Sequence, residues 1–174
     1  CRGDGVNMKL DFRIVTEGLA FPEGPIAMSD GSVLVVEIQS GRLIRVLPDG
    51  SKHVVAELGG GPNGAAIGAD GACYVCNNGG FNWITHEDGF LRPHGRADDY
   101  ERGGIQRVDV ESGNVEWLYT HCDGNPITGP NDIVFDDHGG FYFTDHGKSF
   151  DRFMDRGAVY YATTDCSSIR EVIF

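Results

Sequence analysis

The sequence predicts an all-β protein of the β-propeller class. Three segments align without a gap and indicate an internal repeat: PEGPIAMSDG (22–31), PNGAAIGADG (62–71) and PNDIVFDDHG (130–139). Strand-like runs and glycine-rich turns follow each copy, and no stretch has a convincing helical pattern. A repeated unit of four short antiparallel strands is typical of a propeller blade. A β-sandwich would also contain short strands, but it would not be expected to repeat one motif ahead of successive hairpins.

The strands of each blade can be assigned in order. Residues 9–18 precede the first repeat and predict a lone outer strand that closes the ring against the last blade. Each repeat supplies a first strand and a hairpin signal, and the second strands follow at 32–37, 72–77 and 141–145. The third strands begin at Gly41, Gly103 and Gly157, and a fourth strand follows. About three blades are therefore expected, which is roughly half a ring.

These assignments give one domain. Residues 1–8 are expected to be a disordered or non-native start, and residues 9–174 the N-terminal half of a single propeller with an inserted lid at 78–102. The chain begins at Cys1 and ends in a strand-like run, so we expect natural ends to be missing. A half-propeller that closes by dimerisation is an alternative, although an opened ring exposes two long strand edges. We expect the chain alone to aggregate or to lack activity.

Composition and charge restrict the partners. The chain has 174 residues, of which 40% are hydrophobic, enough for one globular domain. Its formal net charge of −12 and its lack of a basic cluster argue against nucleic acid or an anionic membrane as a partner. No membrane span or signal peptide is visible, so we expect a cytoplasmic protein. The sequence leaves the oligomeric state open.

The five cysteines are scattered, which is more typical of a reducing compartment than of a disulfide framework. Cys73 and Cys76 form a C-x-x-C motif inside a strand-like run. Residues three apart on a strand point to opposite faces, so these two thiols are not suited to bind one zinc ion. We expect both to pack in the core.

One polar residue occupies the same position in each repeat: Glu23, Asn63 and Asn131. The first strand of a blade lies nearest the axis, so these side chains are expected to face the mouth of the central channel. Carboxylate and amide oxygens, without paired His or Cys, suit Ca²⁺, Mg²⁺ or Mn²⁺. The alternative interpretation is that an Asn after Pro only forms a turn by bonding its own backbone.

A second polar set follows fourteen residues later, at Glu37, Asn77 and Asp145, and is predicted on the same rim. Beyond it the loops differ in length, and loops on a rigid scaffold commonly carry binding groups. The longest carries His86 and the aromatic residues Phe81, Trp83 and Phe90, and resembles a lid over a small polar ligand, with a solvated insertion as the alternative. The third copy offers His146, which the adjacent carboxylate could orient.

Several stretches resemble the first half of the regucalcin/gluconolactonase/luciferin-regenerating-enzyme family, from about Phe21 onward. They are FPEGP, GPNGAAIGADG, TGPNDIVFDDHGGFYFTDHG and DRGAVYYATTDCSSIREVIF. The resemblance implies a six-bladed propeller with a divalent ion in its channel, and hydrolysis of a sugar lactone or a related lactone or ester. Calcium is the ion expected, with Zn²⁺, Mn²⁺ or Mg²⁺ as alternatives.

The resemblance also implies roles for individual residues. Glu23 matches the family's carboxylate metal ligand, and Asn131 matches the asparagine that faces metal and substrate. The further metal ligands, including the catalytically essential Asp, would lie in later blades beyond Phe174. The family's substrate-binding Arg is not matched, because Thr128 and Gly129 occupy its place. The identity of the sugar or acid is correspondingly open.

The sequence therefore predicts a divalent-metal-dependent lactone hydrolase. The alternative is a non-enzymatic calcium- or ligand-binding propeller with a structural axial ion. The metal ligands expected in this chain are Glu23 and Asn131. The substrate-binding candidates are Asn63, Asn77, Asp132, Asp145, His146 and His86. The catalytic residue is unknown and its main general base is expected beyond Phe174, with Asp132 and Asp145 as local substitutes.

Overall fold

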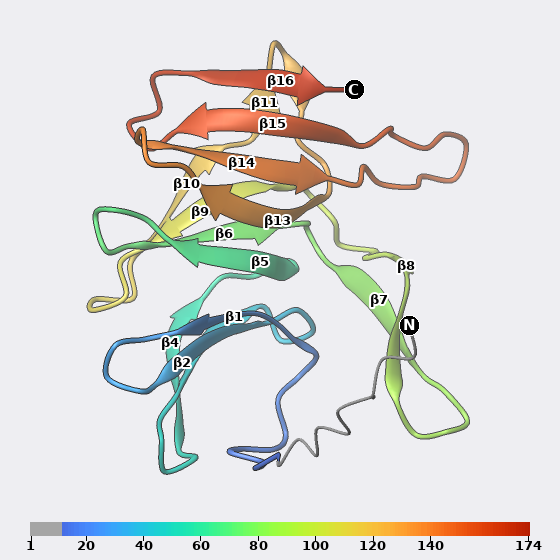
Figure 1. Cartoon of the computed structure of the whole chain (residues 1–174). Helices are drawn as coiled ribbons and strands as arrows, with labels where there is room; N and C mark the ends of the chain where they lie inside the picture. Colours follow the sequence, from blue (N-terminus) through green and yellow to red (C-terminus); the bar gives the residue numbers. More distant parts are fainter. Residues whose placement is uncertain (1–11) are drawn as a thin grey trace, which may run out of the picture.

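The computed structural model describes residues 12–174 and contains three four-stranded antiparallel sheets (Figure 1). The first sheet contains β1 (Pro22–Ala27), β2 (Val33–Glu37), β3 (Arg42–Val46) and β4 (Lys52–Glu57). The second contains β5 (Pro62–Ile67), β6 (Cys73–Asn77), β9 (Gly104–Val108) and β10 (Val115–Tyr119). The third contains β13 (Pro130–Phe135), β14 (Gly140–Asp145), β15 (Ala158–Thr163) and β16 (Ile169–Ile173).

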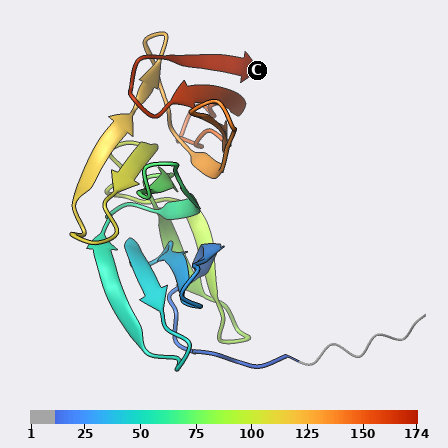
Figure 2. The same cartoon turned by 60° about the vertical axis from the view of Figure 1, so that its left-hand side comes forward.

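These sheets are the predicted blades, and they confirm the all-β propeller class. They follow one another in an arc (Figure 2), and the first strands β1, β5 and β13 lie side by side. The total of six blades in a closed ring stays a prediction. Among residues 12–174 no helix is long and apolar enough to cross a membrane. The predicted start at 1–8 lies outside the described residues.

The predicted lid is an ordered β-hairpin rather than an irregular loop. Its strands are β7 (Phe81–Thr85) and β8 (Leu91–Arg96), inserted between β6 and β9. The turn closes at Asp88 and Gly89, and Gly89 has a φ of 83°, in the left-handed region that glycine adopts at no steric cost. A smaller hairpin, β11 (His121–Cys122) and β12 (Asn125–Pro126), joins the second blade to the third.

Residues 12–18 form no strand in the structure. The outer strand predicted at residues 9–18 was expected to pair with the last blade, so it stays a prediction. This stretch makes separate contacts with the turn between β3 and β4. The Thr16 hydroxyl donates to the Gly50 carbonyl at 3.0 Å, and Lys52 Nζ donates to the Glu17 carbonyl at 2.6 Å. A strand needs a ladder partner along its length, and two contacts of this kind do not supply one.

Two hydrophobic clusters lie between neighbouring blades, and a smaller one lies within the first blade. One cluster joins the first and second blades, and a second cluster joins the second and third. Cys73 belongs to the first cluster and Cys76 to the second, so the two thiols face opposite sides of β6. Both are fully buried, which confirms the predicted packing. Burial raises the pKa of the Cys73 thiol to about 12, so this group stays protonated and unreactive near neutral pH.

We call Glu23, Asn63 and Asn131 the axial residues. The inner strands of adjacent blades approach closely at the glycines that directly follow Glu23 and Asn63. A Cβ atom at Gly24 would lie 2.7 Å from the backbone nitrogen of Ala65. A Cβ atom at Gly64 would lie 2.6 Å from the backbone oxygen of Asn131. Both separations are shorter than side chains tolerate, so the glycines of PEG and PNG allow three strands to converge at one place.

Candidate functional site

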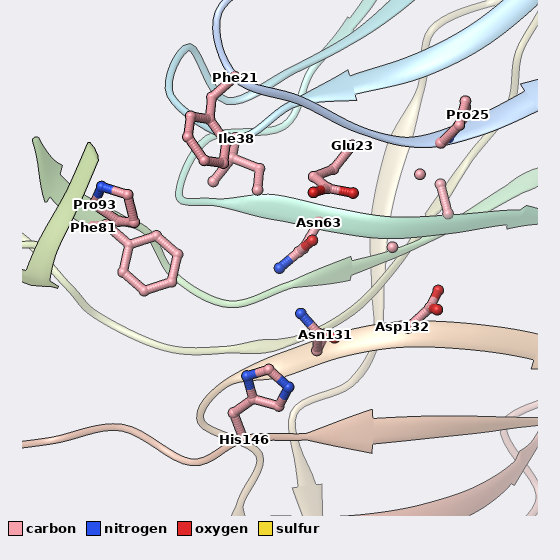
Figure 3. Close-up of a pocket in the computed structure, with 13 residues that line it drawn as sticks. Phe21, Glu23, Pro25, Ile38, Asn63, Phe81, Pro93, Asn131, Asp132 and His146 are labelled. Carbon is pink, nitrogen blue, oxygen red and sulfur yellow. The ribbon is translucent and has the colours of Figure 1, made fainter. Parts of the chain in front are cut away.

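A cavity of about 560 Å³ opens at the leading ends of the three inner strands (Figure 3). Glu23 from β1, Asn63 from β5 and Asn131 from β13 follow one another across it. The structure therefore brings together the three residues that the repeat placed in register.

The local backbone explains why these side chains converge. Each inner strand has a register irregularity at or directly after its axial residue. The irregularities lie between Glu23 and Ile26, Pro62 and Ala65, and Pro130 and Ile133. A bulge of this kind bends a strand and redirects a side chain. The same device in three successive blades turns three polar side chains toward one cavity.

The chemistry of this set fits a hard cation. Within residues 12–174, no group of three or more His, Cys, Asp or Glu is placed to hold a metal. The axial set instead offers one carboxylate and two amide oxygens, which are ligands that Ca²⁺ accepts. An Asn that only forms a turn would bond its own backbone. Among the described residues, the side chains of Asn63 and Asn131 make no such hydrogen bond. Their oxygens are free to bind a ligand.

The second polar set, Glu37, Asn77 and Asp145, binds backbone N–H groups of nearby loops. Glu37 is buried, and its Oε1 accepts a hydrogen bond of 2.9 Å from the backbone N–H of Ala20. Asn77 is buried as well, and its Oδ1 accepts a hydrogen bond of 2.9 Å from the backbone N–H of Gly61. Each side chain therefore fixes the loop that leads into its blade. Asn77 does not line the axial cavity, so we assign it a structural role in place of substrate contact.

Asp145 performs the same task in the third blade. Its carboxylate accepts hydrogen bonds from the backbone N–H groups of Thr128 at 2.9 Å, Gly129 at 2.8 Å and Gly147 at 2.6 Å. Asp145 also does not line the axial cavity, so we assign its carboxylate a structural role. Within residues 12–174, the Asp145 carboxylate makes no hydrogen bond to the His146 ring.

The other substrate candidates separate into two groups. Asp132 and His146 line the axial cavity, where Figure 3 places them near Asn131. Asp132 uses Oδ1 to accept the backbone N–H of Ile133 at 2.9 Å. His86 instead lies at the turn of the β7–β8 hairpin, with Nδ1 3.4 Å from Asp88 Oδ2, and is not part of the cavity lining.

One side of the cavity is apolar. This apolar wall lies beside the polar residues and consists of Phe21, Ile38, Phe81 and Pro93 (Figure 3). Phe21 and Ile38 were not predicted as site residues. The aromatic character of the inserted segment did indicate Phe81, while the FPEGP motif drew attention only to its carboxylate.

Lys148 attaches the third blade to the inserted hairpin. Its side chain is buried, and Nζ donates to the Gly80 carbonyl at 3.0 Å and lies 4.0 Å from the centroid of the Phe81 ring. Cation–π contacts of this kind contribute about 0.5 to 2 kcal/mol. Burial lowers the pKa of Lys148 to about 8, with Asp145 opposing this shift and Arg96 adding to it.

We expect stability to rise with pH because of Lys148. Between the folded pKa of about 8 and the ordinary value of 10.5, the unfolded state binds more protons than the folded state. The free energy of unfolding of the natural protein should therefore increase relative to Lys148→Met, on the order of 2 kcal/mol between pH 8 and pH 10. Urea unfolding of both proteins across this range measures the difference. If the free energies of unfolding of the two proteins change with pH in the same way, the prediction of a lowered Lys148 pKa is wrong.

Comparison with known proteins gives three findings. The model of the family described as SMP-30/Gluconolactonase/LRE-like region matches residues 21–174. Lactonase drp35 of Staphylococcus haemolyticus is 29% identical over 92% of this chain and 43% of its own length, and lactonase drp35 of Staphylococcus saprophyticus is 31% identical over 90% and 40%. The chain thus spans less than half of either relative.

A solved structure adds evidence on the fold. A gluconolactonase from Xanthomonas campestris superimposes with a TM-score of 0.67 at 20% identity, over 91% of this chain and 49% of that protein. At this identity the likeness concerns the fold alone. It matches the arrangement of four-stranded blades described above.

Proposed function

Because the chain belongs to the SMP-30/gluconolactonase/LRE-like family, we propose that the full-length natural protein hydrolyses a lactone, of a sugar or a related compound, with the help of a divalent cation. The observation that carries this proposal is the convergence of Glu23, Asn63 and Asn131 on one cavity. The names of the two staphylococcal relatives support the reaction class.

Glu23 and Asn131 are the residues of this chain that would hold the cation, from two separate blades. A divalent cation bound there would supply a Lewis acid that polarises the lactone carbonyl. Calcium is the ion we propose, because the set consists of carboxylate and amide oxygens. Zn²⁺, Mn²⁺ and Mg²⁺ are the alternatives.

The remaining polar residues of the cavity would act on the substrate. Asn63 can donate to a ring or hydroxyl oxygen through its amide nitrogen and accept through its oxygen. His146 lines the same cavity and can donate or accept a hydrogen bond through its ring nitrogens. Asp132 is the carboxylate of this chain best placed to take a proton from water, because Asp145 does not line the axial cavity. The main base is still expected outside this chain.

Removal of the cation should abolish hydrolysis. We expect EDTA to reduce the turnover of glucono-δ-lactone and related lactones by the full-length protein at least a hundredfold. Addition of one of Ca²⁺, Mn²⁺, Zn²⁺ or Mg²⁺ should restore this activity. Acid release measures turnover. A non-enzymatic propeller with a structural ion would give a different result. Calcium would raise its unfolding temperature without supporting any turnover.

The partners and location follow from the same reasoning. The proposed partner is a small lactone, and neither nucleic acid nor a membrane is proposed. A cytoplasmic location stays a prediction.

A further inference from the structure

The cavity at the inner strand ends has two unlike sides. The polar residues Glu23, Asn63 and Asn131 lie across its middle, and the apolar wall of Phe21, Ile38, Phe81 and Pro93 lies beside them (Figure 3). The wall combines residues from the first blade with residues from the inserted hairpin. It is therefore assembled by the fold from distant parts of the sequence.

The wall is held in place from behind. The ring of Phe21 packs against Trp83 of β7 with a centroid separation of 4.9 Å, and Phe81 packs edge-on against the same Trp83 at 6.3 Å. Lys148 holds the other side of Phe81, as described above. These contacts fix two aromatic rings at the cavity before any ligand arrives, so little side-chain entropy is lost on binding.

The backbone at Phe21 is strained. Its φ is 59°, a conformation that is rare for a bulky residue and energetically unfavourable. This conformation directs an aromatic ring to the cavity instead of to a blade core. Such strain is found where surrounding contacts maintain it, commonly at ligand sites.

We propose that the site prefers a lactone that carries an apolar substituent, which packs against this wall while the ring carbonyl faces the polar residues. A polyhydroxylated lactone would place hydroxyl groups against Ile38 and Pro93, whose side chains offer no hydrogen-bond partner. Hydroxyls desolvated without a partner weaken binding, whereas an alkyl chain gains from the same contact. This inference rests on the proposed function, and it names the substrate class of the same site.

The test compares two six-membered lactones that differ in their substituents. The full-length natural protein, with its divalent cation, should hydrolyse δ-decalactone with a kcat/KM at least tenfold above that for glucono-δ-lactone. An equal value, or a preference for glucono-δ-lactone, would overturn the inference and leave the lactonase proposal intact.

Lactam analogues separate the two proposals, because an amide ring is not turned over. Calorimetry should show tighter binding of the alkyl δ-lactam than of the gluconic acid lactam. If neither lactone is hydrolysed but the alkyl lactam binds better, the lactonase proposal fails and the preference for an apolar ligand stands. Equal or reversed lactam affinities would overturn the preference.

Phe81→Ala tests the wall directly. We expect it to raise KM for δ-decalactone about tenfold with little change in kcat, and to alter KM for glucono-δ-lactone less than twofold. Phe90→Ala is the matched control, because Phe90 lies on the same hairpin, is 70% exposed and does not line the cavity. An equal effect of Phe81→Ala on both lactones would overturn the inference that this wall sets the substrate preference.

Discussion

Glu23→Gln in the full-length protein should reduce lactone turnover by on the order of a hundredfold or more, with the fold retained. The substitution removes the negative charge of the axial set but keeps its size. Groups that only support metal ligands already change affinity or activity by about 10- to 100-fold, so loss of a ligand carboxylate should cost at least as much. Kinetics measures the loss of turnover, and calorimetric titration with Ca²⁺ measures the loss of metal affinity.

The fold should survive because Glu23 is an exposed side chain at the cavity, outside the hydrophobic clusters. Glu57→Gln is the matched control. Glu57 lies on the outer strand β4 of the same blade, where it forms an exposed ion pair with Arg42 at 3.1 Å. Glu57→Gln should change the free energy of unfolding by less than about 1 kcal/mol and leave turnover unchanged. Unchanged turnover in Glu23→Gln would remove this carboxylate from the mechanism.

The repeat made most of the fold predictable. Equivalent positions in a repeat occupy equivalent positions in a blade, so one alignment assigned three sets of strands. The inserted hairpin was harder to predict, because Pro93 and Gly95 weaken the strand pattern of β8. A two-stranded hairpin tolerates them, since each strand has a free edge. Residues 12–18 form no strand here, and the strand predicted for them requires the last blade as its partner.

The site was predicted only where the geometry follows from the repeat. Glu23 and Asn131 share a register, so their convergence could be inferred. Asn77 and Asp145 also share a register, yet their side chains bind backbone N–H groups of nearby loops. The orientation of those N–H groups depends on loop conformation, which residue types do not specify. The wall residue Phe21 was missed for a similar reason, because its position depends on a positive φ.

Gly64→Ala should damage both stability and the axial site. An added Cβ would lie 2.6 Å from the backbone oxygen of Asn131 and 2.6 Å from the Cα of Asp132. Both contacts are with backbone, so β5 and β13 must move apart, at a cost of about 3 kcal/mol. The same movement separates Asn63 from Asn131. Because small displacements of catalytic groups can reduce rates by about a hundredfold, turnover should fall more than the loss of stability alone would explain.

Gly71→Ala separates this clash from the general cost of replacing a glycine. Gly71 lies in the same blade, at the turn between β5 and β6, with a φ of 79° and no atom within 4 Å of an added Cβ. Its substitution should cost about 1 kcal/mol through the backbone alone and leave turnover unchanged in the folded protein. Urea unfolding and turnover, compared between the two variants under conditions where both are folded, give the measurement. If Gly64→Ala behaves like Gly71→Ala, then close contact between the inner strands is not what holds the axial residues together.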